Sequence, residues 1–210
     1  MILLERGKFY HIYNRGINSC TLFLKPENRL YFLRLYRKYI DPVADTFAWA
    51  LMKNHFHLLV RIRLESEIDL NSLPIPKYQD LENYQPKIRE PHHYFSDLFG
   101  SYTKAINKQN HRTGALFERP FRRLQIDNPD YFRNVIIYIH RNPEHHGVSN
   151  DFKLYPWSSY GSILSLQPTR LNRQGVIGSF NGLAEFIAEH DRTTAYEIFS
   201  NYSLESGEAE

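Results

Sequence analysis

The sequence has a single cysteine and no long apolar run, and both shortages narrow the classes of protein it can belong to. Cys20 is the only cysteine among 210 residues, which excludes an internal disulfide and the cysteine-rich zinc sites of fingers and ribbons. No stretch of about 18 apolar residues occurs, and the apolar start at residues 1–4 is far shorter than a signal-peptide core. We therefore expect no membrane span and a protein that works in the cytoplasm.

Two signatures of nucleotide and ester chemistry are also missing. The chain has no GxxxxGK[ST] phosphate loop and no GxSxG elbow, so nucleotide hydrolysis and serine-esterase chemistry lack their usual residues. Aromatic residues, in contrast, are abundant, with 15 Tyr and 14 Phe, while the net charge is only +3. This composition suits a packed core and also suits stacking on nucleobases, and it does not choose between them.

Alternating strand and helix patterns predict an α+β domain. Strands are expected at residues 9–13, 46–52, 55–63 and 116–126, and helices at residues 26–40, 95–110 and 130–141. Lys53 and Asn54 join the second and third strands as an antiparallel hairpin, and the last strand is expected to bend near Pro120. Residues 127–129 cap the third helix and Asn142-Pro143 ends it. This order predicts a ferredoxin-like antiparallel sheet with packed helices.

Two regions fall outside this pattern. Residues 64–92 hold six acidic residues, three basic residues and four prolines with little periodicity, so we expect an exposed, partly disordered insertion there. Residues 166–210 are expected to form a C-terminal helical appendage with one amphipathic helix near residues 183–190. The main domain then covers residues 1–165.

His55 and His57 are the first candidates for chemistry. They lie in the predicted third strand, where residues two apart share a face and are separated by roughly 6.6–6.8 Å along the strand. Both imidazoles can therefore converge on one divalent ion, while Phe56, Leu58 and Val60 point into the core. The alternative is an ordinary half-exposed strand that happens to carry two histidines, and the apolar residues on either side favour the metal site. We expect both histidines to face an open site and to contribute little to stability.

The predicted third helix offers a candidate nucleophile and a candidate third ligand. Tyr138 and Asn142 are four residues apart and so share one helical face. A helical tyrosine usually belongs to the core, but the aliphatic residues at 135–137 and 139 already supply a buried surface there. Asn142 can offer its amide oxygen to a metal or cap the helix end. Three histidines lie nearby, of which we expect at least two to be ordinary surface residues: His140, His145 and His146.

Positive charge gathers between residues 101 and 125. Arg and Lys neutralise phosphates and aromatic rings accept stacked bases, and this stretch interleaves both types with one acid, Glu118. The alternative is a solvated helix face followed by a basic strand, and we favour contact with nucleic acid. The residues expected to carry it are Lys104, Lys108, Arg112, Arg119, Arg122 and Arg123, interleaved with Tyr102, Phe117 and Phe121.

With these residues identified, the chain resembles the REP-associated tyrosine transposases, a branch of the single-tyrosine HUH transposases. The resemblance spans about residues 9–160 in the family's order and leaves out the insertion and the tail. Glu144 departs from it, because a small aliphatic residue is expected after Asn-Pro. The matching stretches are Tyr13-Asn14-Arg15-Gly16, MKNHFHLL at residues 52–59, GALFERPFR at 114–122, YIHRNP at 138–143 and YPWSSY at 155–160.

The resemblance implies a fold, an activity and a set of roles. The fold is the HUH endonuclease fold, in which His55, His57 and Asn142 hold the metal and Tyr138 is the nucleophile. The implied activity is cleavage of single-stranded DNA beside imperfect hairpins through a 5′-phosphotyrosine, followed by rejoining without ATP. Asn14 and Arg15 join the residues expected to contact DNA, and the protein is expected to act as a monomer or a homodimer.

A divalent ion is the expected cofactor. A phenol has a pKa of about 10 and is a poor nucleophile at neutral pH, so something must activate it or make the phosphorus more electrophilic. A divalent ion that contacts the scissile phosphate would do the second. Histidine is an unusual ligand for Mg²⁺, which prefers oxygen, while Mn²⁺ accepts both kinds of ligand. We expect Mg²⁺ in the cell because it is abundant, with Mn²⁺ as an effective substitute.

Two other functions compete with strand cleavage. A catalytically silent relative that only binds DNA hairpins would have lost a ligand or the nucleophile, and all four groups are present. A zinc-dependent hydrolase or metal-storage protein using the ten histidines would need a third strong ligand. No HExxH or HxE…CxxC pattern supplies one, so that function ranks third.

Overall fold

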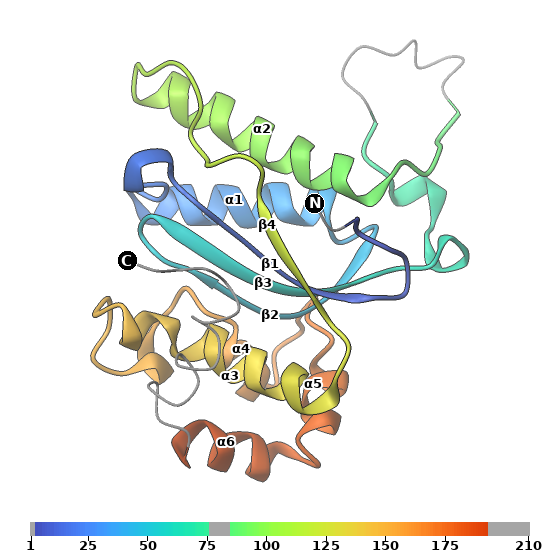
Figure 1. The fold of residues 1–210 in the computed structure, drawn as a ribbon, viewed down its shortest axis with the longest axis vertical. Helices are drawn as coiled ribbons and strands as arrows, with labels where there is room; N and C mark the ends of the chain where they lie inside the picture. The colour runs from blue at the N-terminus through green and yellow to red at the C-terminus, as the bar shows by residue number, and fades with distance from the viewer. Residues whose placement is uncertain (1–2, 76–84, 193–210) are drawn as a thin grey trace.

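Four antiparallel strands form one sheet in the order β2-β3-β1-β4 (Figure 1). The computed structural model describes residues 3–75 and 85–192. Since β1 and β2 both pair antiparallel with β3, they run parallel to each other and need a crossover connection, as β3 and β4 also do. This is the ferredoxin-like arrangement, and the predicted α+β class is confirmed. The strands are β1 (Phe9–Arg15), β2 (Ala44–Leu51), β3 (His55–Ile62) and β4 (Arg122–Ile126).

Helices cover both faces of the sheet (Figure 1). The two crossover helices, α1 (Pro26–Tyr39) and α2 (Pro91–Gln109), lie on one face, called here the upper face. The lower face carries α3 (Pro129–His145) and three shorter helices, α4 (Tyr160–Leu164), α5 (Arg173–Ser179) and α6 (Leu183–Arg192). Within the described ranges, no helix combines the length and the apolar character needed to cross a membrane.

Strand alternation sorts side chains between two cores. Phe56, Leu58 and Val60 of β3 point to the upper face, where they pack among residues of α1 and α2 as predicted. Leu59 points to the lower face and packs among residues of α3 and α5. His55 and His57 share the face of Leu59, so the fold directs both imidazoles toward α3.

Two predicted boundaries are wrong, and both lie beside a proline. The strand predicted from residue 116 is regular only over β4, because Pro120 has no N–H to give to a ladder and Phe117 makes only an isolated bridge to Gly16. The helix predicted to end at Asn142-Pro143 continues to the end of α3. Only one turn remains after Pro143, and a hydrogen bond of 3.0 Å from the His146 N–H to the Asn142 carbonyl closes it.

The other predicted elements are confirmed with small shifts at their ends. The hairpin between β2 and β3 turns at Lys53 and Asn54. The side chain of Asn128 caps α3, since its Oδ1 accepts hydrogen bonds from the N–H groups of Asp130 and Tyr131. Helix α2 begins at Pro91, four residues before the predicted start. Its first two residues therefore belong to the segment predicted as an insertion.

The described part of the predicted insertion is anchored to the upper core. Short 3₁₀ turns at Glu65–Glu67 and Leu70–Ser72 place Ile68 and Leu73 among the buried residues, although most of their neighbours are exposed. Residues 76–84, the centre of the segment predicted to be disordered, lie outside the described residues, as do residues 193–210 of the predicted appendage.

The C-terminal helices complete the lower core. Val176 of α5, Phe180 after it and Phe186 of α6 are buried together with the apolar face of α3. The segment leading into α5 is attached to β2, since the Asn172 N–H donates to the Thr46 carbonyl at 2.8 Å. Helix α5 therefore packs against β2, and α6 packs against α3.

A buried chain of hydrogen bonds joins α6 to α3. His190 Nδ1 lies 2.7 Å from the Phe186 carbonyl, so this nitrogen carries the proton and His190 Nε2 is left to accept. His140 Nδ1 then donates to His190 Nε2 at 2.9 Å, and His140 Nε2 accepts from the Ser159 hydroxyl at 2.7 Å. With both rings neutral, each of the four ring nitrogens of His140 and His190 either donates or accepts one hydrogen bond. Burial lowers the pKa of His190 to about 4.

Acid should weaken this arrangement and with it the stability of the fold. An exposed histidine has a pKa near 6.5, so between pH 6.5 and 4 the unfolded chain binds a proton at His190 that the folded chain does not. The stabilisation is complete above pH 6.5 and is lost as the pH falls toward 4. His190 alone should lower the free energy of unfolding by on the order of 2 kcal/mol between pH 7 and 5. Urea denaturation of His190→Gln, whose amide accepts a hydrogen bond but does not titrate, should show a shallower pH dependence; an equally steep one would contradict this account.

Candidate active site

The lower face of the sheet brings together three side chains that the sequence singled out. His57 of β3 lies opposite Tyr13 of β1, His55 lies opposite Arg15, and α3 covers this row of residues. The ring centroids of His55 and His57 are 5.3 Å apart, and those of His57 and Tyr138 are 5.4 Å apart. A hairpin strand and a helix about 80 residues later along the chain thus meet in one cluster.

One ring nitrogen of His55, Nε2, has a lone pair that accepts no hydrogen bond from the described residues. Its Nδ1 lies 2.8 Å from Asn54 Oδ1, which fixes the proton on Nδ1 and leaves Nε2 unprotonated. Nε2 is buried and has no hydrogen-bond partner among the described residues. Burial lowers the pKa of His55 to about 3, assisted by the charges of His146 and Arg15, and the nearby Asn142 side chain works in the opposite direction. The ring is therefore neutral at pH 7, the form that binds a metal.

Asn142 presents a second unused acceptor. Its side chain is fully buried, and Nδ2 donates to the Tyr138 carbonyl at 3.3 Å. Its Oδ1 has no hydrogen-bond partner within the part of the chain that the structure describes. It does not cap the helix, because α3 continues past it. A buried acceptor left unpaired costs roughly 1–3 kcal/mol, so two of them on facing elements require an explanation. A cation held by both atoms supplies one.

His57 is built into a buried ring cluster, which corrects the expectation of an open site. Only 2% of His57 and 3% of Tyr138 are exposed. His57 Nδ1 and His11 Nε2 share a hydrogen bond of 2.9 Å, and their rings stack at 5.1 Å. Burial lowers the pKa of His11 to about 3 and the pKa of His57 well below its usual value, so both rings are neutral. His11 was missed from the sequence, although its two-residue spacing from Tyr13 places both on one strand face.

Around His55 and His57, the described residues supply no third side chain of the usual metal-binding types that is placed to hold an ion with them. Across residues 3–75 and 85–192, no group of three or more His, Cys, Asp or Glu side chains is arranged to hold a metal ion. The zinc-hydrolase and metal-storage alternatives would each need such a group, and the described residues do not supply it. His145 and His146 are exposed as expected, and the His146 ring lies 4.6 Å from that of His55 at the end of α3. The polar groups that the structure brings together here are the two imidazoles and the side chain of Asn142.

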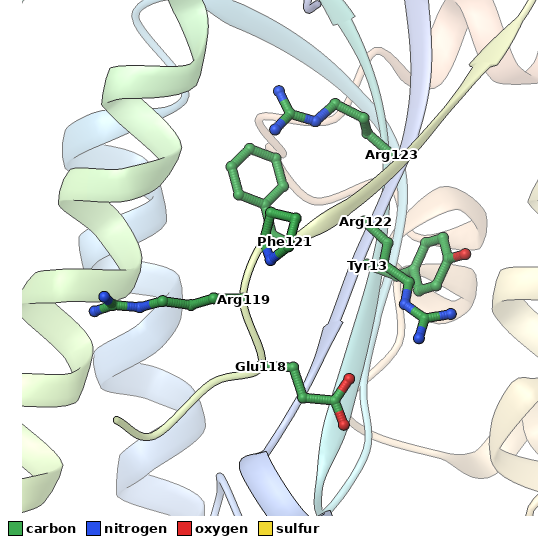
Figure 2. A pocket seen from close by; sticks show the side chains of 7 residues that line it. Tyr13, Glu118, Arg119, Phe121, Arg122 and Arg123 are labelled. Carbon is green, nitrogen blue, oxygen red and sulfur yellow. The ribbon is translucent and has the colours of Figure 1, made fainter. Parts of the chain in front are cut away.

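A pocket of about 520 Å³ borders this cluster at the edge strand β4 (Figure 2). Tyr13 forms one wall, and its ring stacks on His57 with the centroids 5.6 Å apart. The side chain of Arg122 lies beside the Tyr13 ring, and the carboxylate of Glu118 lies at the same side of the segment (Figure 2). Residues 118–123 form the remaining lining. The pocket and the histidine cluster therefore share Tyr13 as a common wall.

The residues predicted to bind DNA separate into two surfaces. Arg119 and Arg122 are exposed and line the pocket at the sheet edge, and Arg15 is exposed at the end of β1, outside the lining. Lys104 and Lys108 are exposed on α2, which covers the opposite face of the sheet from the histidines. The structure therefore does not bring the two lysines to the candidate site.

Three other predicted DNA contacts are used within the protein. The side chain of Asn14 is buried, where Nδ2 donates to the Glu118 carbonyl at 3.3 Å, so this placement does not offer it to DNA. Arg112 donates to Asn107 Oδ1 and to the Ala115 carbonyl, closing the end of α2. Arg123 is half-buried with its guanidinium 4.2 Å from the Phe121 ring centroid, and burial lowers its pKa.

The aromatic residues interleaved with the basic stretch do not form a stacking surface. Tyr102, Phe117 and Phe121 are all buried in the upper core against α2 and the sheet. The suggestion that they accept bases is therefore wrong, because the helical and strand periodicity that spaced them among the basic residues also turned them inward. The aromatic ring at the pocket that is close to the histidines is Tyr13.

Comparison with known proteins agrees with the fold. No family model and none of the curated proteins matches the sequence. Among solved structures, the chain is similar to that of a REP-associated tyrosine transposase bound to a REP hairpin, with a TM-score of 0.54 and 14% sequence identity. The match covers 80% of this chain and 87% of that chain. At this identity it establishes the fold, in accord with the family resemblance of the motifs.

The two histidines should differ in what they contribute to stability. His57→Ala leaves the buried His11 Nε2 without its partner and opens a gap among stacked rings, so it should lower the free energy of unfolding by about 1–3 kcal/mol. His55 is only half-buried and its Nε2 holds no partner, so His55→Ala should cost clearly less. Urea denaturation in EDTA measures both variants. Equal losses of unfolding free energy in the two variants would contradict the larger contribution assigned to His57.

Proposed function

We propose that this chain is a metal-dependent enzyme that cuts and rejoins single-stranded DNA beside hairpins, with Tyr138 as the nucleophile. The observation that carries the proposal is the pair of buried, unpaired acceptors, His55 Nε2 and Asn142 Oδ1, beside the contact between His57 and Tyr138. The similar solved structure holds a REP hairpin, and we propose hairpin DNA as the substrate class here as well.

His55, His57 and Asn142 would hold the ion. The two imidazoles are neutral because burial lowers the pKa of each, and the amide oxygen has no internal partner. A set of two nitrogens and one oxygen suits Mn²⁺ and accepts Mg²⁺, which is more abundant in cells. When bound, such an ion withdraws charge from the scissile phosphate and aligns it for in-line attack.

The covalent step needs only the tyrosine hydroxyl and the DNA. The Tyr138 oxygen forms a bond to phosphorus while the bond from phosphorus to the 3′ oxygen breaks, giving a 5′-phosphotyrosine and a free 3′-OH. The phenol gives up one proton and the leaving oxygen takes one, so no net proton is consumed. Rejoining is the reverse reaction, and no ATP is needed because the phosphotyrosine keeps the energy of the original bond.

The surroundings of Tyr138 serve to orient it. Its ring meets the rings of His57 and His11 edge-to-face, with centroids 5.4 and 5.7 Å apart. These contacts hold the ring on the rigid helix α3, so the nucleophile is positioned before DNA arrives. Because only 3% of the side chain is exposed, the site must open around Tyr138 when DNA binds.

Tyr138→Phe should abolish covalent attachment to DNA and leave hairpin binding within a few-fold of wild type. The substitution removes the attacking oxygen but keeps the ring that packs on His57. The assay mixes the protein and Mn²⁺ with a pool of imperfect hairpins that carry random flanks and a 3′ label. The adduct is then resolved on a denaturing gel. Tyr131→Phe, two turns earlier on α3, is the matched control and should still form the adduct.

Two outcomes would contradict the proposal in different ways. A wild-type protein that binds the hairpins and never forms an adduct would be the catalytically silent relative. An adduct that survives in Tyr138→Phe and disappears in Tyr131→Phe would move the nucleophile to the start of the helix.

A further inference from the structure

The pocket at β4 lies close to the nucleophile. Tyr13 is paired with Arg122 on one side and with His57 on the other, and paired residues of neighbouring strands share a face. The Tyr13 ring stacks on His57 at 5.6 Å, and His57 contacts the Tyr138 ring at 5.4 Å. A group bound in the pocket is therefore two ring contacts away from the attacking residue.

Tyr13 offers a rigid aromatic wall. Its ring is nearly parallel to the rings of His11 and His57, with interplanar angles of 29° and 18°. These contacts fix the ring without help from a ligand. A fixed aromatic ring beside an arginine is the combination that stacks an unpaired base and neutralises its phosphate. The pocket is an open hollow of about 520 Å³ along the edge strand.

Glu118 is the unusual member of the lining. Its backbone is fixed to β1, because its N–H donates to the Arg15 carbonyl at 2.9 Å and its carbonyl accepts from the buried Asn14 side chain. Its carboxylate, however, has no hydrogen bond or ion pair with any residue in the described ranges. Two exposed arginines, Arg119 and Arg122, line the same pocket. A lone carboxylate there weakens phosphate binding unless the ligand donates hydrogen bonds to it.

We infer that this pocket binds one unpaired nucleobase near the cut bond, and that Glu118 selects bases that carry an exocyclic amino group. Glutamate accepts hydrogen bonds from such groups, as it does from cytosine N4. The Watson–Crick edge of thymine instead carries two carbonyl oxygens on either side of a single N–H. The Glu118 carboxylate repels these oxygens. The inference rests on the proposed function for the identity of the ligand as single-stranded DNA, and it adds a base preference to it.

The test is a binding measurement that needs neither metal nor cleavage. Fluorescence anisotropy in EDTA at pH 8 compares the full chain with labelled dC10, dA10 and dT10. The wild-type protein should bind dC10 and dA10 about five-fold or more tightly than dT10. Glu118→Gln should bring that ratio close to one, because an amide donates to thymine as readily as it accepts from cytosine.

A matched control removes the general effect of charge. Glu27 is exposed at the start of α1, on the upper face, and Glu27→Gln changes the net charge by the same amount. It should tighten or leave unchanged the binding of all three oligonucleotides and preserve their ratio. A wild-type ratio near one, or a ratio that Glu118→Gln leaves intact, would overturn the pocket assignment alone. A wild-type protein that binds none of the three decamers but still binds the imperfect hairpins of the adduct assay would also overturn the pocket assignment alone. Failure to bind the hairpins as well would overturn the proposed function together with it.

Discussion

The packing of α3 against the lower face of the sheet is the constraint on which the candidate site depends. The sheet contributes His55 and His57 from one strand, and the helix contributes Tyr138 and Asn142 one turn apart. Rotation of α3 by one residue turns its side chains by about 100°, which would separate the tyrosine from His57 and the amide from His55. The helix is held against such rotation by its apolar face in the lower core and by the hydrogen-bond chain from His140 to α6. The C-terminal helices thus help to set the geometry of the site.

One row of side chains across the sheet connects the histidine cluster with the edge pocket. Arg122, Tyr13 and His57 are successive neighbours on β4, β1 and β3, so the edge pocket and the histidine cluster form one continuous surface. Exposed Arg15 lies opposite His55 at the end of this row, whereas the Arg119 side chain points to the other side of the segment (Figure 2). The lysines of α2 lie on the other side of the sheet and belong to a separate surface.

Local patterns were enough to predict most elements, because strand and helix periodicity are properties of neighbouring residues. The same patterns failed beside Pro120 and Pro143, where the outcome depends on which backbone groups find partners in the folded chain. His55, His57, Tyr138 and Asn142 were predicted from their spacing and the family resemblance, and the structure places them together. Their partners His11 and His190 were missed, since a contact between β1 and β3 or between α3 and α6 leaves no local pattern. Burial also removed Asn14 and Arg123 from the predicted DNA surface, which composition alone did not foresee.

Direct measurement of Mn²⁺ binding tests the central claim, that α3 and β3 together form one metal site next to Tyr138. Isothermal titration of the full chain without DNA should show one site in the wild-type protein. Loss of the Asn142 oxygen in Asn142→Ala should weaken binding by about tenfold or more, whereas the charged oxygen of Asn142→Asp should restore or strengthen it. Electron paramagnetic resonance of bound Mn²⁺ should detect imidazole nitrogen that disappears in His55→Ala. Identical affinities for the wild type and both Asn142 variants, or an ion that contacts no histidine nitrogen, would contradict the account.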